Sequence, residues 1–300
     1  MIRVAVVGAG AMGTHHARVF SRCEGASLAG VFDTSAAASS RVAAAVDAQP
    51  FASLDDAIEA AELVVIATPI DTHRSIAQRA LLAGRAVLVE KPLCASSAEA
   101  HALVAAAERA GSVRLFVGHS ERFNPVIVAL QGALSGERVR EVELERLGPP
   151  RGRVLEHGVC INLAVHDVDL AALLFGAKMD LLRAEGHDGA ALLHLACTHG
   201  IATVHVSQVA AERVRRVRVV CQRHVFEGDL LRGALLRDGQ PLPVSSEEPL
   251  LAQARAVVEA LAGRQARCAT GADGAAAVGL VDEAASWLRE PPRHVSAAAP

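Results

Sequence analysis

Short apolar runs alternate with stretches of helical periodicity from the N-terminus to residue 119. The apolar runs cover residues 2–7, 27–32, 63–67, 86–89 and 113–117, and the helical stretches cover residues 11–21, 35–46, 53–60, 72–83 and 96–111. Apolar strands this short, without polar alternation, are typical of a parallel sheet covered by helices on both faces. The pattern therefore predicts a doubly wound α/β domain over residues 1–119.

A different pattern begins at residue 120. Helical periodicity recurs at 125–134, 162–175, 247–261 and 272–288, and strand-like runs occur at 139–147, 190–197, 201–209, 214–221 and 235–236. Runs of this kind joined by Gly and Asp turns predict a meander of neighbouring strands. We therefore expect residues 120–300 to form a second α/β domain with an open, mainly antiparallel sheet.

The balance of charge narrows the classes of function. Lys and Arg number 30 and Asp and Glu number 33, which gives a net charge of −3. A surface that coats nucleic acid or an anionic membrane would need an excess of basic residues. With 7 Phe, 1 Trp and no Tyr, the chain has few rings on which bases could stack. We expect no nucleic-acid partner and no membrane partner, and no tyrosine can serve as a catalytic acid.

The cysteines indicate a reducing compartment. No two of them are spaced as CxxC, and all lie within or beside apolar runs, which is typical of buried, reduced thiols. They are Cys23, Cys94, Cys160, Cys197, Cys221 and Cys268. No apolar run reaches the roughly 18 residues that span a bilayer. The 13 His show no metal-ligand spacing. We therefore expect a cytoplasmic protein without a metal site.

A glycine-rich turn of the form GxGxxG follows the first apolar run and opens the first helix. Its backbone would offer free N–H groups and the positive end of the helix dipole to a pyrophosphate. The residues expected at the pyrophosphate are Gly8, Gly10, Ala11, Met12 and Gly13. Asp33 ends the next strand, where a carboxylate bonds ribose hydroxyls and repels a 2′-phosphate. The pattern predicts NAD rather than NADP; the alternative is a turn that binds nothing, with Asp33 capping the following helix.

Glu90, Lys91 and Pro92 stand at the carboxyl end of the expected strand 86–89, the edge at which an open parallel sheet binds ligands. Lys91 and Lys178 are the only lysines among 30 basic residues, so a position that required only charge would be arginine. The compact ammonium of lysine, whose pKa shifts readily, therefore indicates chemistry at Lys91. The alternative is an ordinary lysine at a strand end.

His166 lies on the strongly apolar helix predicted at 162–175, where a polar side chain is costly unless it is paired or functional. Asn162 precedes it by four residues and Asp169 follows it by three, so both can share its face. Histidine is the side chain best suited to accept a proton near neutral pH. The alternative is a core histidine satisfied by Asp169.

Five motifs occur in the order found in one family of oxidoreductases. They are Gly8–Gly13, Thr68-Pro69 with His73, Glu90-Lys91-Pro92, Gly118–Pro125 and His166–Asp169. Together they make residues 2–175 resemble the Gfo/Idh/MocA oxidoreductases. The resemblance implies a Rossmann domain followed by an open-sheet domain, whose exposed face joins subunits into a homodimer or homotetramer.

The same resemblance implies NAD(P)-dependent oxidation or reduction at a sugar or cyclitol carbon. Lys91 would match the family's conserved lysine and His166 its catalytic histidine, so we expect His166 to remove a hydroxyl proton and Lys91 to stabilise the developing alkoxide. The Lys91–Pro92 bond would be cis. The residues expected along the cofactor, besides the glycine-rich turn and Asp33, are Thr68, Pro69, His73, Glu90 and Lys91.

Asn162 departs from the family pattern, which often has an aspartate one turn before the histidine. An amide can orient an imidazole or bond a substrate hydroxyl, but it cannot neutralise an imidazolium. Either Asp167 or Asp169 supplies the missing charge, or His166 is a weaker base.

Residues 119–125 and 166–169 resemble most closely the family members that act on UDP-N-acetylglucosamine at the 3-position. That likeness predicts a nucleotide-sugar substrate. The residues expected to contact it are Arg122, Asn124, Asn162 and Asp169. Arg151 and Arg153 are candidates for a pyrophosphate contact, or for a solvated loop. The alternatives are a dehydrogenase of a free sugar or cyclitol, a dinucleotide-bound regulator without turnover, and a semialdehyde reductase.

Overall fold

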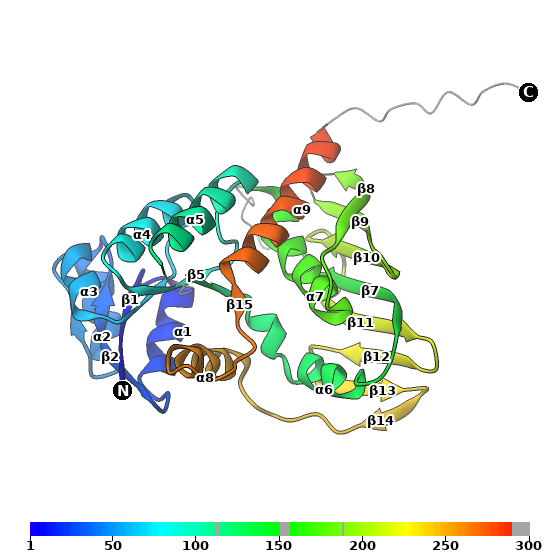
Figure 1. Cartoon of the computed structure of the whole chain (residues 1–300), viewed down its shortest axis with the longest axis horizontal. Helices are drawn as coiled ribbons and strands as arrows, with labels where there is room; N and C mark the ends of the chain where they lie inside the picture. Colours follow the sequence, from blue (N-terminus) through cyan, green and yellow to red (C-terminus); the bar gives the residue numbers. More distant parts are fainter. Residues whose placement is uncertain (112–114, 151–156, 188, 290–300) are drawn as a thin grey trace, which may run out of the picture.

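The computed structural model describes residues 1–111, 115–150, 157–187 and 189–289. Arg151 and Arg153 therefore lie outside the described residues, as does the first part of the strand expected at 113–117. Two sheets organise the described chain, and helices lie between and around them (Figure 1).

The first sheet is the parallel sheet that the apolar runs predict. Its strands are β1 (Ile2–Val7), β2 (Ala26–Phe32), β3 (Gln49–Pro50), β4 (Leu63–Ile66), β5 (Ala86–Glu90) and β6 (Leu115–Gly118). They are parallel and lie in the order β6-β5-β4-β1-β2-β3, which is the order of a Rossmann sheet. The carboxyl ends of β1, β2, β4 and β5 therefore meet at one edge, where the glycine-rich turn, Asp33 and Lys91 stand.

Helices cover both faces of this sheet. On one face lie α1 (Ala11–Phe20), α2 (Ala36–Ala44) and α8 (Pro249–Leu261), and on the other lie α3 (Leu54–Ala60), α4 (Ile70–Leu82) and α5 (Ser97–Arg109). In Figure 1, α4 and α5 lie above the sheet and α8 below it. Serine caps begin three of these helices, α2, α3 and α5. In the last two, the hydroxyls of Ser53 and Ser96 accept hydrogen bonds from the amides of Asp56 and Glu99. Helices α3 and α5 thus begin where the helical stretches at 53–60 and 96–111 were expected to begin.

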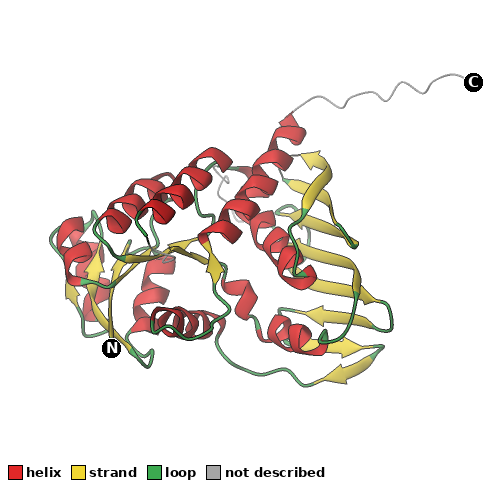
Figure 2. Cartoon of the chain, viewed as in Figure 1, coloured by secondary structure: helices red, strands yellow, loops and turns green. Residues whose placement is uncertain are grey.

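The second sheet is mainly antiparallel, as expected. Its strands are β7 (Val139–Leu147), β8 (Asp180–His187), β9 (Ala190–Cys197), β10 (Gly200–Ser207), β11 (Val214–Cys221), β12 (Val225–Asp229), β13 (Ala234–Arg237) and β14 (Gln240–Leu242). They lie in the order β14-β13-β12-β11-β7-β10-β9-β8, and only β7 and β10 are parallel neighbours. Helices α6 (Pro125–Ala133) and α7 (Val165–Phe175) pack on one face. Figure 2 shows no described helix on the other face; assembly through that face stays a prediction.

The C-terminal part of the chain returns to the first sheet. Helix α8 packs beside α1, and the short strand β15 (Ala269–Thr270) pairs antiparallel with β6. Helix α9 (Gly271–Arg289) then joins both cores: Val278 lies in the core of the first sheet and Val281 in that of the second. The division of the chain into residues 1–119 and 120–300 stays a prediction, and part of the second stretch stabilises the first sheet.

The apolar helix expected at 162–175 begins differently from the prediction. A π-helical turn at Cys160–Ala164 precedes α7, so the helical backbone starts before Asn162. A π-turn inserts one extra residue into helical winding and is frequent at functional sites. Across the described residues, no helix is both long and apolar enough to cross a membrane.

Candidate active site

The glycine-rich turn needs glycine at two positions because other backbone approaches closely. A Cβ on Gly8, whose φ is +102°, would lie 2.5 Å from the carbonyl oxygen of Ala67. A Cβ on Gly13 would lie 1.7 Å from the carbonyl oxygen of Gly8. Gly10 is different, since its Cβ would have no atom within 4 Å. The turn is therefore packed against the β4–α4 loop on one side and open at Gly10, as a pyrophosphate cradle requires.

Asp33 follows β2 beside this cradle. Its two carboxylate oxygens accept hydrogen bonds from the amides of Ala9, at 2.6 Å, and Ser35, at 2.8 Å. Each oxygen keeps a further lone pair for a ribose hydroxyl. Asp33 thus supports the glycine-rich turn and the start of α2; its contact with a ribose stays a prediction.

The Thr68 loop lies against the same cradle and is held by His73. The two ring nitrogens of His73 lie 2.9 Å from the carbonyl oxygens of Thr68 and Pro92. Burial lowers the pKa of His73. His73 is 2% exposed, so it is placed to support the loop that carries Thr68 and Pro69, and contact of these residues with a cofactor stays a prediction.

Glu90 fixes the backbone at Lys91. The carboxylate lies 2.7 Å from Nε2 of His16 on α1 and accepts the amide of Lys91 at 3.2 Å. Burial would raise the pKa of Glu90, but the hydrogen bond and charge of His16 and the charge of Lys91 hold it below its usual value. The Lys91–Pro92 bond is cis, as the resemblance implied. The sequence did not identify His16, because nothing local links it to Glu90.

Lys91 and His166 line one cavity of about 580 Å³. Its other described lining residues are Arg146, Leu147, Gly148, Pro149, Asn162, Leu163, Ser207, Gln208, Arg213 and Arg215. The ammonium of Lys91 donates to the carbonyl oxygen of Asn162, in the π-turn, at 3.3 Å. The side-chain amide of Asn162 donates to the carbonyl oxygen of Gly158 at 2.8 Å. The chain thus brings the two expected catalytic groups together at the carboxyl edge of the first sheet.

Two arginines of this cavity were missed by the sequence analysis. Arg146 donates two hydrogen bonds to Asp167, at 2.7 and 3.0 Å, and one to Glu121 at 3.0 Å. Arg215 donates to the same Glu121 oxygen at 2.6 Å. Burial alone would lower the pKa of Arg146, but Asp167 and Glu121 raise it. This arginine–carboxylate network forms one wall of the cavity.

A signal for both arginines is present in the sequence. On β7 the buried phase runs through Val142, Leu144 and Arg146, and on β11 it runs through Arg215, Val217 and Val219. The two arginines are paired across the strands. Like charges directly opposite each other are destabilising, and the carboxylates of Glu121 and Asp167 offset that cost. An arginine at a position of an apolar strand that alternation predicts to be buried is therefore the pattern that would have located this wall of the cavity.

Arg122, Asn124 and Asp169 differ from their expected substrate role. Arg122 donates two hydrogen bonds to Asp169, at 2.8 and 2.6 Å, and the pair is buried. Asn124 accepts the amide of Val126 and so begins α6. None of the three lines the cavity, because each is bonded within the joint between β6 and the second sheet. Of the four expected substrate contacts, Asn162 alone lines it.

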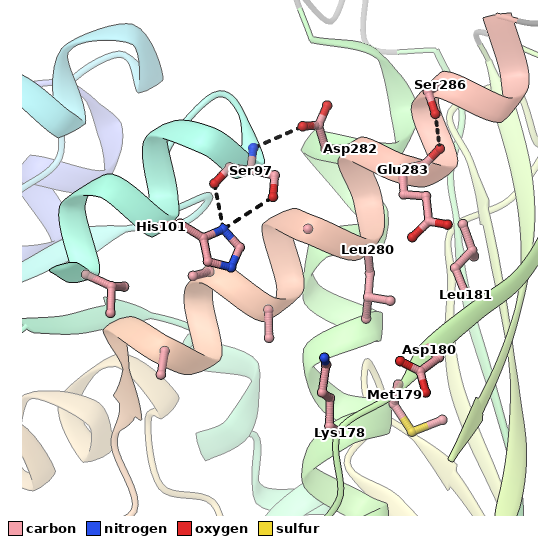
Figure 3. A pocket seen from close by; sticks show the side chains of 15 residues that line it. Ser97, His101, Lys178, Met179, Asp180, Leu181, Leu280, Asp282, Glu283 and Ser286 are labelled. Carbon is pink, nitrogen blue, oxygen red and sulfur yellow. Dashed lines mark hydrogen bonds between the residues drawn. The ribbon is translucent and has the colours of Figure 1, made fainter. Parts of the chain in front are cut away.

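A second cavity, of about 750 Å³, lies between α5, α9 and the start of β8 (Figure 3). Its polar groups largely bond one another: the amide of Ser97 donates to Asp282, and His101 contacts the carbonyl oxygen of Ser97. Figure 3 shows the bond between Ser97 and Asp282 joining α5 to α9, and Lys178 further along the cavity. Neither Lys91 nor His166 lines this space. The smaller cavity therefore holds the candidate chemistry.

The fold and the site define an NAD-dependent oxidoreductase of the Gfo/Idh/MocA family, to which the chain belongs. A family model described as an oxidoreductase family with an NAD-binding Rossmann fold matches residues 2–119. The UDP-N-acetylglucosamine 3-dehydrogenase of Acidithiobacillus ferrooxidans is 35% identical over 78% of this chain and 76% of its own. A solved structure of that enzyme has a TM-score of 0.88 at 30% identity, over 96% of this chain and 97% of the other.

Two further proteins are informative. The inositol 2-dehydrogenase of Rhizobium meliloti is 32% identical over 59% of this chain and 56% of its own. GenD2 from gentamicin A biosynthesis, solved in complex with NAD, has a TM-score of 0.82 at 25% identity, over 96% of this chain and 94% of the other. The family and its cofactor are thus shown by several relatives, whereas the named substrates differ among them.

Replacing Asp33 by asparagine is expected to test the role of its negative charge in cofactor preference. Asp33→Asn keeps one acceptor, for the amide of Ala9, loses the acceptor for the amide of Ser35, and removes the carboxylate that repels a 2′-phosphate. We expect it to reduce the preference for NAD over NADP by about tenfold or more, which is ~1.4 kcal/mol. Calorimetric titration of both cofactors measures the ratio. An unchanged ratio would remove Asp33 from the ribose site.

Proposed function

We propose that the protein is an NAD-dependent dehydrogenase that oxidises a ring hydroxyl of a nucleotide sugar, such as the 3-position of UDP-N-acetylglucosamine. The cavity that Lys91 and His166 line together carries this proposal. Oxidising an alcohol requires a group that takes the hydroxyl proton and a group that bonds the oxygen, and these two side chains can divide those tasks. They are the proposed catalytic pair.

The cofactor would be held by the glycine-rich turn, Asp33 and the Thr68 loop, which form the open cradle at Gly10. NAD, when bound, supplies the acceptor for the hydride from the substrate carbon. The chain's own part is to hold the sugar hydroxyl at Lys91 and His166. The position of Lys91 supports this division between cofactor and chain. Lys91 directly follows the carboxyl end of β5, on the side of the cradle, and its side chain lines the cavity.

The cavity wall supports an anionic substrate over a neutral cyclitol. Arg213 is exposed and lines the cavity, and no described carboxylate forms an ion pair with it. Arg215, two residues further along, shares Glu121 with Arg146. Guanidinium groups bond phosphate oxygens through paired donors, so a diphosphate suits this rim. Inositol brings no charge to it, although inositol dehydrogenases are also among the relatives.

A substrate comparison tests the proposal. UDP-N-acetylglucosamine, free N-acetylglucosamine and myo-inositol are each incubated with the enzyme and NAD, and reduced nicotinamide is followed by its absorbance. We expect kcat/KM for the UDP-sugar to exceed that for the free sugar by about 100-fold, the effect of two charge-assisted hydrogen bonds. A higher kcat/KM for myo-inositol would contradict the nucleotide-sugar assignment, and no turnover with any polyol would contradict the dehydrogenase.

Matched arginine variants locate the anion contact. Arg213→Ala should raise KM for the UDP-sugar about tenfold and leave KM for the free sugar unchanged. Arg216→Ala is the control, because Arg216 is exposed on β11, the strand that begins directly after Arg213, but does not line the cavity. Equal effects of both variants would show that general surface charge, and not this rim, binds the substrate.

A further inference from the structure

His166 lacks the partner that a histidine base requires. A histidine that takes a proton on one ring nitrogen becomes doubly protonated, and its other N–H needs an acceptor. Nδ1 of His166 is enclosed and has no hydrogen-bond partner among the described residues. The ring lines the cavity, so Nε2 is the atom left to face a substrate. An imidazolium here would bury an unsatisfied N–H donor.

The carboxylates that could neutralise His166 are bonded elsewhere. Asp167 receives two hydrogen bonds from Arg146, and Asp169 receives two from Arg122. The side chain at the preceding turn is the amide of Asn162, which donates to the carbonyl oxygen of Gly158. Neither neighbouring aspartate therefore supplies the missing charge. Of the alternatives left open by the sequence, the one that remains is that His166 is a weaker base.

The surrounding charges also oppose a proton on His166. Burial, first, and then the charges of Lys91, Arg146, His119 and Arg215 hold the pKa of His166 well below its usual value. Lys91 directly follows β5, His119 directly follows β6, and the two arginines lie on β7 and β11. His166 is consequently neutral at physiological pH, and it is a poor proton acceptor. It is well suited to donate one hydrogen bond from Nε2.

Lys91 has the opposite character. Burial lowers its pKa to about 8; Glu90 and Glu121 oppose this shift, and Arg146 and Arg215 add to it. At pH 7, Lys91 is then uncharged in about a tenth of the molecules, whereas a free lysine is uncharged in well under a thousandth. Its Nζ is 3.3 Å from the carbonyl oxygen of Asn162, which can hold an amine or an ammonium at the cavity.

We propose that Lys91, and not His166, takes the proton of the substrate hydroxyl, while neutral His166 donates a hydrogen bond from Nε2 to the same oxygen. The O–H bond breaks, its proton forms the ammonium of Lys91, and its electron pair forms the second bond of the carbonyl. The C–H bond breaks, and its electron pair leaves as hydride to the oxidised nicotinamide. The ammonium then returns its proton to water. This assignment rests on the proposed dehydrogenase function and reverses the two roles expected from the sequence.

A titration followed by magnetic resonance tests the protonation states without turnover. Because Lys91 and Lys178 are the only lysines, protein labelled with carbon-13 at lysine Cε gives two signals. The Lys91 signal should titrate near pH 8, below the 10.4 of a free lysine. Lys91→Arg assigns the signal. Nitrogen-15 imidazole shifts, assigned with His166→Gln, should show His166 still neutral at pH 6.5, where an ordinary histidine is half protonated. A His166 that takes up a proton in this range, or a Lys91 midpoint near the 10.4 of a free lysine, would overturn the proposal.

Paired variants then separate donating a hydrogen bond from accepting a proton. The amide of His166→Gln can donate but cannot act as a base, whereas His166→Leu can do neither. We expect kcat to fall within about tenfold for His166→Gln, about 100-fold or more for His166→Leu, and about 1,000-fold or more for Lys91→Met. The low-pH limb of kcat/KM should lie near pH 8 and survive in His166→Gln.

Equal losses in His166→Gln and His166→Leu, with Lys91→Met less affected than either, would restore His166 as the base. If the wild-type enzyme oxidises no sugar, the proposed function fails, but the titrations still report which group can take a proton. The two failures are therefore distinguishable.

Discussion

Arg146→Met is expected to destabilise the fold by about 3–5 kcal/mol. The variant leaves the carboxylate of Asp167 buried without the two hydrogen bonds that Arg146 donates, and it also removes one partner of Glu121. Thermal unfolding followed by circular dichroism should show a midpoint lower by about 10 °C. The loss is large because both side chains of the Arg146–Asp167 pair are nearly inaccessible to water, with 4% and 3% exposed.

Arg218→Met provides the matched control on β11. Arg218 donates to Glu143 at 3.1 Å, but both side chains are 41% exposed, so the variant should cost no more than about 0.5 kcal/mol.

In Arg146→Met, burial alone would act on Asp167 and raise its pKa. The folded variant then binds a proton that the unfolded chain releases, so its stability should decrease as pH rises above the unfolded pKa of about 3.9. Equal losses in the two variants would contradict a buried network.

Gly13→Ala should abolish NAD binding and destabilise the first sheet. The added Cβ would meet the carbonyl oxygen of Gly8 at 1.7 Å, and since both partners are backbone, the turn itself must move. We expect a loss of stability of about 3 kcal/mol or more and a Kd for NAD raised by about 100-fold or more, since the turn places the helix N-terminus at the pyrophosphate. Thermal unfolding and calorimetric titration measure the two effects.

Gly10→Ala separates cofactor binding from folding. Its Cβ would meet no atom within 4 Å, and the φ of −72° suits alanine, so stability should stay within about 0.5 kcal/mol of the wild type. The methyl group would, however, occupy the open side of the cradle and weaken NAD binding about tenfold or more. Unchanged NAD affinity in this variant would mean that the pyrophosphate does not approach the turn at Gly10.

The first sheet could be predicted closely because its determinants are local. Each strand is a short apolar run, and serine caps mark helix starts such as those after Ser53 and Ser96. The meeting of Lys91 with His166 could also be anticipated, but only through the order of motifs, since no spacing relates β5 to α7. Strand β15 was missed because a strand of two residues has no periodicity.

The partners of the acidic residues were less accessible from sequence. Asp169 was expected to meet His166 because the two share a helix face, yet it bonds Arg122 from the segment after β6. Helical spacing indicates which side chains of one helix can contact each other, but it does not indicate which side chains from other elements compete for the same partner. A guanidinium forms two hydrogen bonds with a carboxylate, so it displaces a single imidazole contact. The pairing of Asp169 with an arginine from another element therefore leaves His166 without a carboxylate partner.

The return of the C-terminal chain has a consequence for dissecting this protein. A fragment ending at residue 119 would retain the glycine-rich turn and Asp33 but lose α8, whose Val257 and Val258 are buried against the first sheet. It would also lose β15, leaving β6 as a bare edge. Such a fragment should aggregate, and a soluble nucleotide-binding half would require residues 249–289 to be grafted back onto it.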